Sequence, residues 1–133
     1  MMEVDLRARL LDDAAVAAFV GTRVDWTVRP QKDQLPAVVL QLVADLRTQH
    51  MGGFQYYRET RIQVDCFGRL RRDVVALREA VISCLAGEAV KGDTDFLRAF
   101  INTVQDMGEQ TDTGFIHRDM IDITIWHGIA PAT

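Results

Sequence analysis

The strict alternation of apolar and polar residues near the end of the chain constrains the fold most. Within the segment Phe115 to His127, isoleucine stands at every second position from Ile121 to Ile125, and mostly polar or amphipathic residues stand between. The two sets are Ile121, Ile123 and Ile125, and Met120, Asp122, Thr124 and Trp126. Successive side chains of a strand point to opposite faces of a sheet, so the segment predicts a strand buried on one face. The chain must build a sheet and cover one side of it.

Four further segments have strand character. Alternation is clear from about Gln55 to Phe67, where Ile62, Val64 and Cys66 share one face and Arg61, Gln63 and Asp65 the other. Ala37 to Leu46 is almost continuously apolar, which indicates cover on both faces. The remaining two predicted strands are Arg23 to Val28 and about Phe96 to Asp106.

Two segments have helical periodicity. From Glu3 to about Phe19 the apolar residues recur at three- and four-residue steps, and Asp12-Asp13 predicts a bend or break before Ala14 to Val20. From about Arg69 to Ala86 the same spacing predicts a second helix with one packing face, ending at Gly87.

The predicted order is therefore α-β-β-β-α-β-β. We expect an α+β fold with a mostly antiparallel sheet of about five strands and two helices packed on one face. Loops are expected at Arg29 to Pro36, Arg47 to Phe54 and Met107 to Thr113, with a loose tail from Gly128 to Thr133. With 133 residues and no composition break, residues 1–133 are expected to form one domain.

Composition narrows the classes of function. The formal net charge is −4, with both signs dispersed, whereas a nucleic-acid-binding protein usually carries a basic excess. No apolar run is long enough to span a membrane, and the first residues lack a signal-peptide core. We expect a cytosolic protein without specific DNA binding or membrane insertion.

The residues of chemical interest do not assemble into a motif. The histidines His50, His117 and His127 and the cysteines Cys66 and Cys84 have no metal-ligand spacing. No phosphate-binding glycine motif is present either. The sequence predicts no catalytic residues, no metal and no cofactor. One alternative remains open, a small α+β hydrolase or ligand-binding module that uses Cys66, Asp65 and a histidine.

Candidate interface residues fall in three places. Aromatic and basic residues flank Gly52-Gly53, arginines cluster at the start of the second helix, and one arginine lies on the polar face of a strand. The set is Arg47, His50, Met51, Phe54, Tyr56, Tyr57, Arg61, Arg69, Arg71 and Arg72. The arginine cluster has two interpretations: a solvated helix end near Asp73, or an inter-subunit ion-pair site.

Four segments, in this order, resemble the tail-completion (tail-terminator) proteins of long-tailed phages. They are the helix end Ala15 to Gly21; the strand entry Leu35-Pro36; Arg61 to Phe67 leading into a helix with Ala76-Leu77; and Thr113-Gly-Phe with Arg118 and Ile125-Trp126-His127. The resemblance extends from the first helix to His127.

The resemblance implies a structural virion protein without enzymatic residues. Such proteins form a ring, typically hexameric, that caps the head-proximal end of the tail tube, stops its polymerisation and receives the head connector. The implied partners are further copies of the chain, the tail tube protein and a connector or stopper protein, with DNA passing through the lumen. We expect a monomer, or a weak monomer–ring equilibrium, in dilute solution and a sixfold ring on the tail. The protein is expected first in the cytoplasm of the producing cell and then in the tail of a phage or phage-derived particle. Another connector or neck subunit is the nearest alternative.

Overall fold

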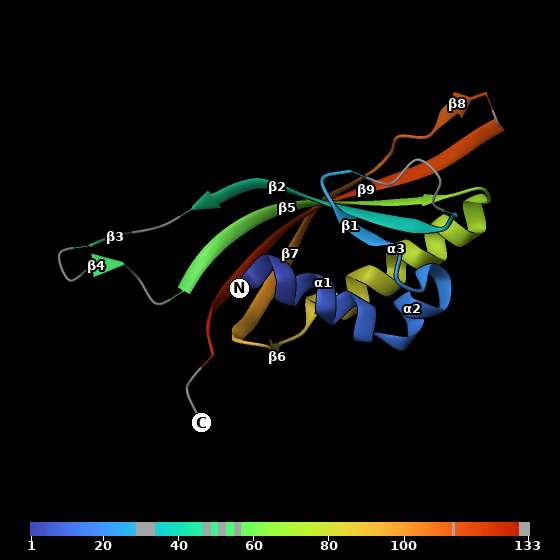
Figure 1. Ribbon diagram of the computed structural model, residues 1–133. Helices are drawn as coiled ribbons and strands as arrows, with labels where there is room; N and C mark the ends of the chain where they lie inside the picture. Colours follow the sequence, from blue (N-terminus) through green and yellow to red (C-terminus); the bar gives the residue numbers. More distant parts are fainter. Residues whose placement is uncertain (29–33, 47–48, 51–52, 55–56, 113, 131–133) are drawn as a thin grey trace.

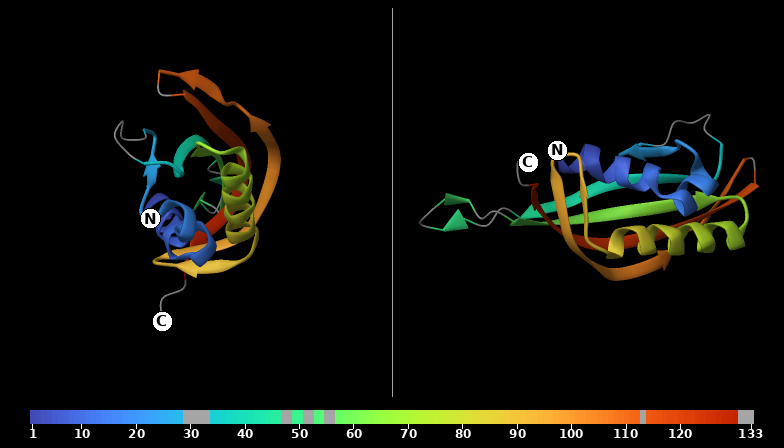
Figure 2. Two further views of the ribbon diagram at one scale, coloured as in Figure 1. Left: turned by 90° about the vertical axis from the view of Figure 1, so that its right-hand side faces the viewer. Right: turned by 90° about the horizontal axis from the view of Figure 1, so that it is seen from below.

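The computed structural model describes residues 1–28, 34–46, 49–50, 53–54, 57–112 and 114–130, with the backbone alone at 49, 50, 53, 54 and 57. Three helices in this part of the chain lie on one side of a long sheet (Figure 1). Seen along the strands, the sheet curls about the helices (Figure 2). The fold is α+β, as the sequence predicts.

The sheet of the described residues has seven strands, in the order β1-β2-β5-β9-β7-β6, with β8 paired to β9. Their bounds are β1 Val24–Trp26, β2 Ala37–Leu46, β5 Tyr57–Gly68, β6 Ala89–Lys91, β7 Thr94–Asp106, β8 Glu109–Thr111 and β9 Gly114–Ile129. Every pair is antiparallel except β1 and β2. The prediction of a mostly antiparallel sheet is confirmed.

The helices are α1 (Met2–Asp12), α2 (Ala14–Val20) and α3 (Arg71–Ala86). The predicted break after α1 is present, because the backbone of Asp13 is extended there. Oδ1 of Asp13 accepts hydrogen bonds from the backbone N–H groups of Ala15 at 3.0 Å and Val16 at 3.1 Å. A carboxylate at this position satisfies N–H groups that have no partner within the helix, so Asp13 starts α2 as a separate helix.

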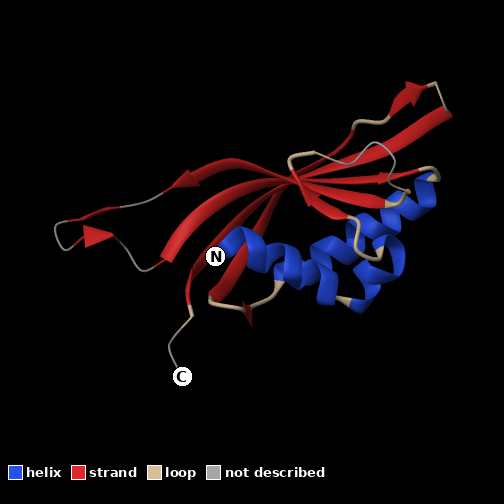
Figure 3. Cartoon of the chain, viewed as in Figure 1, coloured by secondary structure: helices blue, strands red, loops and turns tan. Residues whose placement is uncertain are grey.

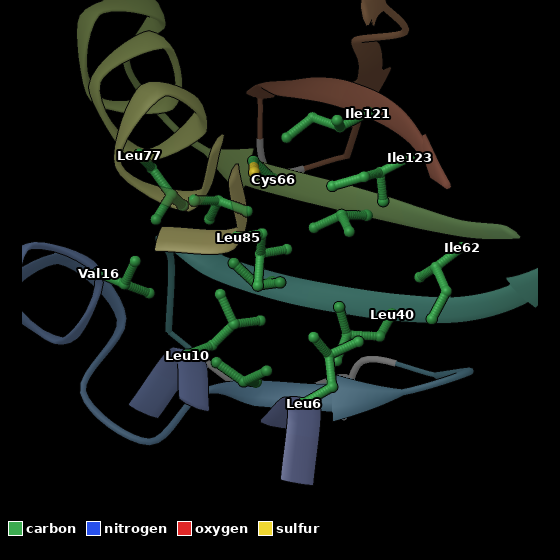
Figure 4. Close-up of a cluster of buried hydrophobic side chains, with 14 of the residues drawn as sticks. Leu6, Leu10, Val16, Leu40, Ile62, Cys66, Leu77, Leu85, Ile121 and Ile123 are labelled. Carbon is green, nitrogen blue, oxygen red and sulfur yellow. The ribbon is translucent and has the colours of Figure 1, made fainter. Parts of the chain in front are cut away.

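The core lies between the helices and one face of the sheet (Figure 4). It contains the alternate, apolar side chains of the two long central strands: Ile62, Val64 and Cys66 from β5 and Ile121, Ile123 and Ile125 from β9. The helices contribute Leu6, Leu10, Val16, Leu77 and Leu85. The alternation therefore predicts correctly which face of each strand is buried.

Several predicted details are wrong. The described residues form three helices rather than two, and seven strands in the main sheet rather than about five. The three-residue strand β8 lies in the predicted connection Met107 to Thr113, and β6 lies in a stretch for which no strand was predicted, since so short a segment carries no readable alternation. Gly128 and Ile129 extend β9 instead of opening a loose tail, because β7 and β5 offer them backbone partners.

The sheet extends beyond the helices at both ends (Figure 3). At one end, beyond β2 and β5, lies a two-stranded sheet of β3 (Gln49–His50) and β4 (Gly53–Phe54), where the sequence predicts only a loop. At the other end β8 and the start of β9 form a hairpin. No helix of the described residues is both long enough and apolar enough to cross a membrane.

Candidate functional site

The predicted interface residues are divided between the two ends of the molecule. His50 lies on β3, Phe54 on β4 and Tyr57 at the start of β5, whereas Arg47, Met51 and Tyr56 fall outside the described residues. The arginines Arg69, Arg71 and Arg72 lie beyond the opposite end of β5, at the start of α3 (Figure 2). The structure therefore does not bring these two groups together into one patch.

Arg61 belongs to the face of the sheet that the helices leave uncovered. Its guanidinium forms an ion pair with Asp122 on β9, in which Nε donates to Oδ1 at 2.9 Å. Asn102 of β7 donates to Oγ1 of Thr124 at 2.9 Å on the same face. The hydrogen bonds from Arg61 hold the pKa of Asp122 below its usual value.

A shallow groove of about 470 Å³ runs over this uncovered face. Its lining residues come from four adjacent strands: Ala44, Leu46, Glu59, Arg61, Asn102 and Thr124. The lining combines apolar side chains with ion-paired and amide groups. This is a surface suited to contact with a protein rather than a pocket for chemistry.

A second ion pair spans the same face nearer the start of α3. Nη2 of Arg118 on β9 donates to Oδ2 of the buried Asp65 on β5 at 2.9 Å, and Gln63 donates to the same carboxylate at 3.1 Å. The Arg118 guanidinium also lies 5.4 Å from the centre of the Phe67 ring. The charges on the uncovered face are therefore largely balanced within the sheet.

The arginine cluster at the start of α3 separates into different roles. Arg71 forms an ion pair with the fully buried Asp119 of β9 and lies 3.8 Å from Asp106. Arg72 is 85% exposed and lies 4.0 Å from Asp73, as the solvated interpretation predicts. Arg69 is exposed. Because Asp119 engages Arg71, that arginine attaches α3 to the sheet and is less available to a partner.

The sequence analysis missed Asp119 and its second partner, Arg78. Nη1 of Arg78 donates to Oδ2 of Asp119 at 2.9 Å. Asp119 has the same parity as Ile121 and Ile123, so its position predicts a carboxylate on the buried face, which requires a cationic partner. Arg71 and Arg78 are seven residues apart on α3, which places them on one side of the helix.

The groups of the enzymatic alternative do not meet. Cys66 is fully buried in the core, and this burial raises its pKa far above the usual thiol value. Asp65, next to it, points to the other face and pairs with Arg118. His127 contacts Thr60 instead, with 2.6 Å between Nε2 and Oγ1. A cysteine nucleophile needs a nearby base and an accessible sulfur, so these residues do not support the hydrolase alternative.

Comparisons with known proteins give a consistent result. The family model described as tail completion protein gp17 matches residues 4–127. A chain in a solved structure described as the virion of a native gene transfer agent (GTA) particle has a similar fold, with a TM-score of 0.67 and 14% identity. That alignment covers 96% of this chain and 94% of the other.

A second solved chain aligns over 100% of this chain and 99% of its own length, with a TM-score of 0.51 and 13% identity. At these identities the two similarities concern the fold alone. A search of curated proteins finds no match.

Proposed function

This chain belongs to the phage tail-completion family, and from that membership we propose that it forms a ring on the head-proximal end of a tail tube. The ring stops tube polymerisation and presents a surface to the head connector. The match of the family model over residues 4–127 carries the proposal, because it includes all three helices nearly in full and every strand of the central sheet. The fold shared with a chain of a gene transfer agent virion supports a place in a tail of that kind.

The structure supports an assembly role in a second way. Both ends of the sheet extend beyond the helices, which gives one chain reach toward neighbours above and below it in a stack of rings (Figure 1). The end formed by β3 and β4 and the end formed by β8 and β9 differ in sequence and shape. Two different ends suit a protein that contacts a tube protein on one side and a connector or stopper on the other.

We propose a hexamer whose lumen lets DNA pass without specific binding. The balanced charges of the uncovered face agree with this, since Arg61 and Arg118 are already paired with Asp122 and Asp65. A cation held by a carboxylate on its own sheet offers little net attraction to phosphate groups. Assembly takes place in the producing cell, and the ring then stays in the tail of the particle.

Deleting the gene from a strain that produces the particles tests this proposal. Electron microscopy should show tails of abnormal length, or heads without tails, and a plasmid copy of the gene should restore tails of normal length. Normal tails joined to heads in the deletion strain would overturn the proposal. Tails of normal length that fail to join heads would instead assign the chain to the connector or neck, the nearest alternative.

A further inference from the structure

On each side of the sheet, part of a long strand has no neighbouring strand in the described residues. In the described residues, no strand pairs with the outer side of β2 after Leu40, the last residue opposite β1. None pairs with the outer side of β7 after Phe96, the last residue opposite β6. An open edge exposes backbone N–H and C=O groups that can pair with another chain.

The middle of the β7 edge lacks the charged residues and prolines that often protect such an edge. From Ala99 to Gln105 it contains no charged residue and no proline. The side chains of Phe100 and Ile101, which point to opposite faces, are 46% and 36% exposed. Lysines, prolines or a covering loop often prevent edge-to-edge pairing, so a partly apolar edge without charges or prolines favours a partner strand.

On the helix-covered face of the sheet, a row of apolar side chains runs from the β2 edge to the β7 edge. Leu42 of β2 is opposite Ile62, Ile62 is opposite Ile123, and Ile123 is opposite Ile101 of β7. The two inner residues are fully buried, whereas Leu42 at one end of this row is 47% exposed. A second copy placed at the β7 edge would set its Leu42 beside Ile101 and continue the apolar row.

The uncovered face matches in the same way. The next row runs from Ala44 of β2 through Arg61 and Thr124 to Phe100 of β7. Across such a pairing Phe100 of one copy would lie opposite Ala44 of the next, whose small side chain leaves room for the ring. A pairing of β7 with another β7 would instead be isologous, and such a contact closes a dimer rather than a ring.

Strand direction also permits a continuous sheet. The strands β2, β5, β9 and β7 alternate in direction, so β2 and β7 run antiparallel to each other. A neighbouring copy related by rotation therefore presents its β2 antiparallel to β7. Single-residue bulges at Val43 and Asn102 increase the local twist, so pairing is expected in short stretches on either side of them.

We propose that the β7 edge of one copy pairs with the β2 edge of the next, so that the sheets of all subunits join around the ring. The contact is head-to-tail, which is the type that closes into rings. This inference rests on the proposed function, because it names the partner surfaces of that ring.

Cysteine crosslinking in assembled particles tests the pairing. In a Cys84→Ser background, the double variant Leu42→Cys/Ile101→Cys should give a ladder of covalent oligomers under oxidation, since paired strands bring Cα atoms within disulfide range. Each single variant should give only the uncrosslinked chain. The control pair Leu42→Cys/Val90→Cys, which places the second thiol at an exposed position on β6, should also stay monomeric.

A charge exchange provides a second readout. Ile101→Lys should abolish tailed particles while the isolated chain unfolds at an unchanged temperature, and adding Leu42→Glu should restore them. Val90→Lys is the matched control and should leave the particles intact.

Three results would overturn the pairing: crosslinked dimers from Ile101→Cys alone, no ladder in particles with normal tails, or no restoration by Leu42→Glu. In each case the proposed function stands or falls separately, by the tail lengths in the deletion strain.

Discussion

The carboxylate of Asp119 on β9 accepts a 2.9 Å hydrogen bond from Nη1 of Arg78 on α3, across 41 positions of sequence. Arg71, seven residues earlier on the same side of α3, donates to the other oxygen of the same carboxylate. Asp119 is fully buried, so the two arginines compensate a charge that would otherwise be costly to bury. This cluster fixes the position of α3 on the sheet.

Replacing Asp119 should therefore destabilise the fold strongly. We expect Asp119→Asn to lower the free energy of unfolding by about 3–5 kcal/mol, because two partly buried arginines lose their shared carboxylate. Urea denaturation of the purified chain measures this. Glu79→Gln is the matched control, since Glu79 is the exposed partner of the same Arg78, and its effect should stay within about 0.5 kcal/mol. Equal effects of the two substitutions would contradict the structural role of Asp119.

His127 should make stability depend on pH. Burial, with a contribution from Arg58, lowers its pKa to about 4, well below its ordinary value of 6.5. Between these values the unfolded chain binds more protons than the folded one, so stability is complete above about pH 6.5 and falls as the pH decreases toward 4. By about pH 4 the free energy of unfolding should have decreased by about 3 kcal/mol.

Carboxylates also titrate in this pH range, so a variant without His127 is needed to identify the contribution of this histidine to the pH dependence of stability. His127→Gln should flatten the stability profile between pH 6.5 and 4, whereas His117→Gln, at a half-buried position, should retain it. The measurement is urea denaturation at a series of pH values. A parallel profile for His127→Gln and the unmodified chain would show that His127 does not carry the effect.

Gly92 should not tolerate a side chain. Its φ of +59° is unfavourable for other residues, and a Cβ atom there would collide with the carboxylate of Asp5. Gly92→Ala should cost about 1–3 kcal/mol of stability. The control is Gly87→Ala, because the space around Gly87 is open and its φ is −94°. That substitution should be neutral or slightly stabilising in the same thermal unfolding experiment.

Helix α1 offers a matched pair of apolar positions. Leu6 is fully buried against the sheet, whereas Val4 is 62% exposed. Leu6→Ala should lower the free energy of unfolding by about 2–5 kcal/mol, since it leaves a cavity in the core. Val4→Ala should change it by no more than about 0.5 kcal/mol. Chemical denaturation distinguishes the two, and a small effect of Leu6→Ala would show that α1 does not pack as described.

The sequence alone determined the burial of the long strands and the division of the first helix. Alternation along β5 and β9 identified which residues face the core, because side-chain direction in a strand depends only on parity. It also located β2 correctly, from Ala37 to Leu46. The pair Asp12-Asp13 predicted a break with a new helix start, and Asp13 provides it because its carboxylate bonds N–H groups only two and three residues away. These are local relationships, which the order of residues contains.

Only the tertiary structure decided which distant residues meet. Whether Arg71 is a free surface charge or the partner of Asp119 depends on how α3 lies on β9, and nothing near either residue specifies that. The strands β6 and β8 are three residues long and form because β7 and β9 offer them backbone partners. The free edges of β2 and β7 likewise follow from the order of strands in the sheet. Strand order and pairing are set by packing of the whole chain, to which local sequence preference contributes little.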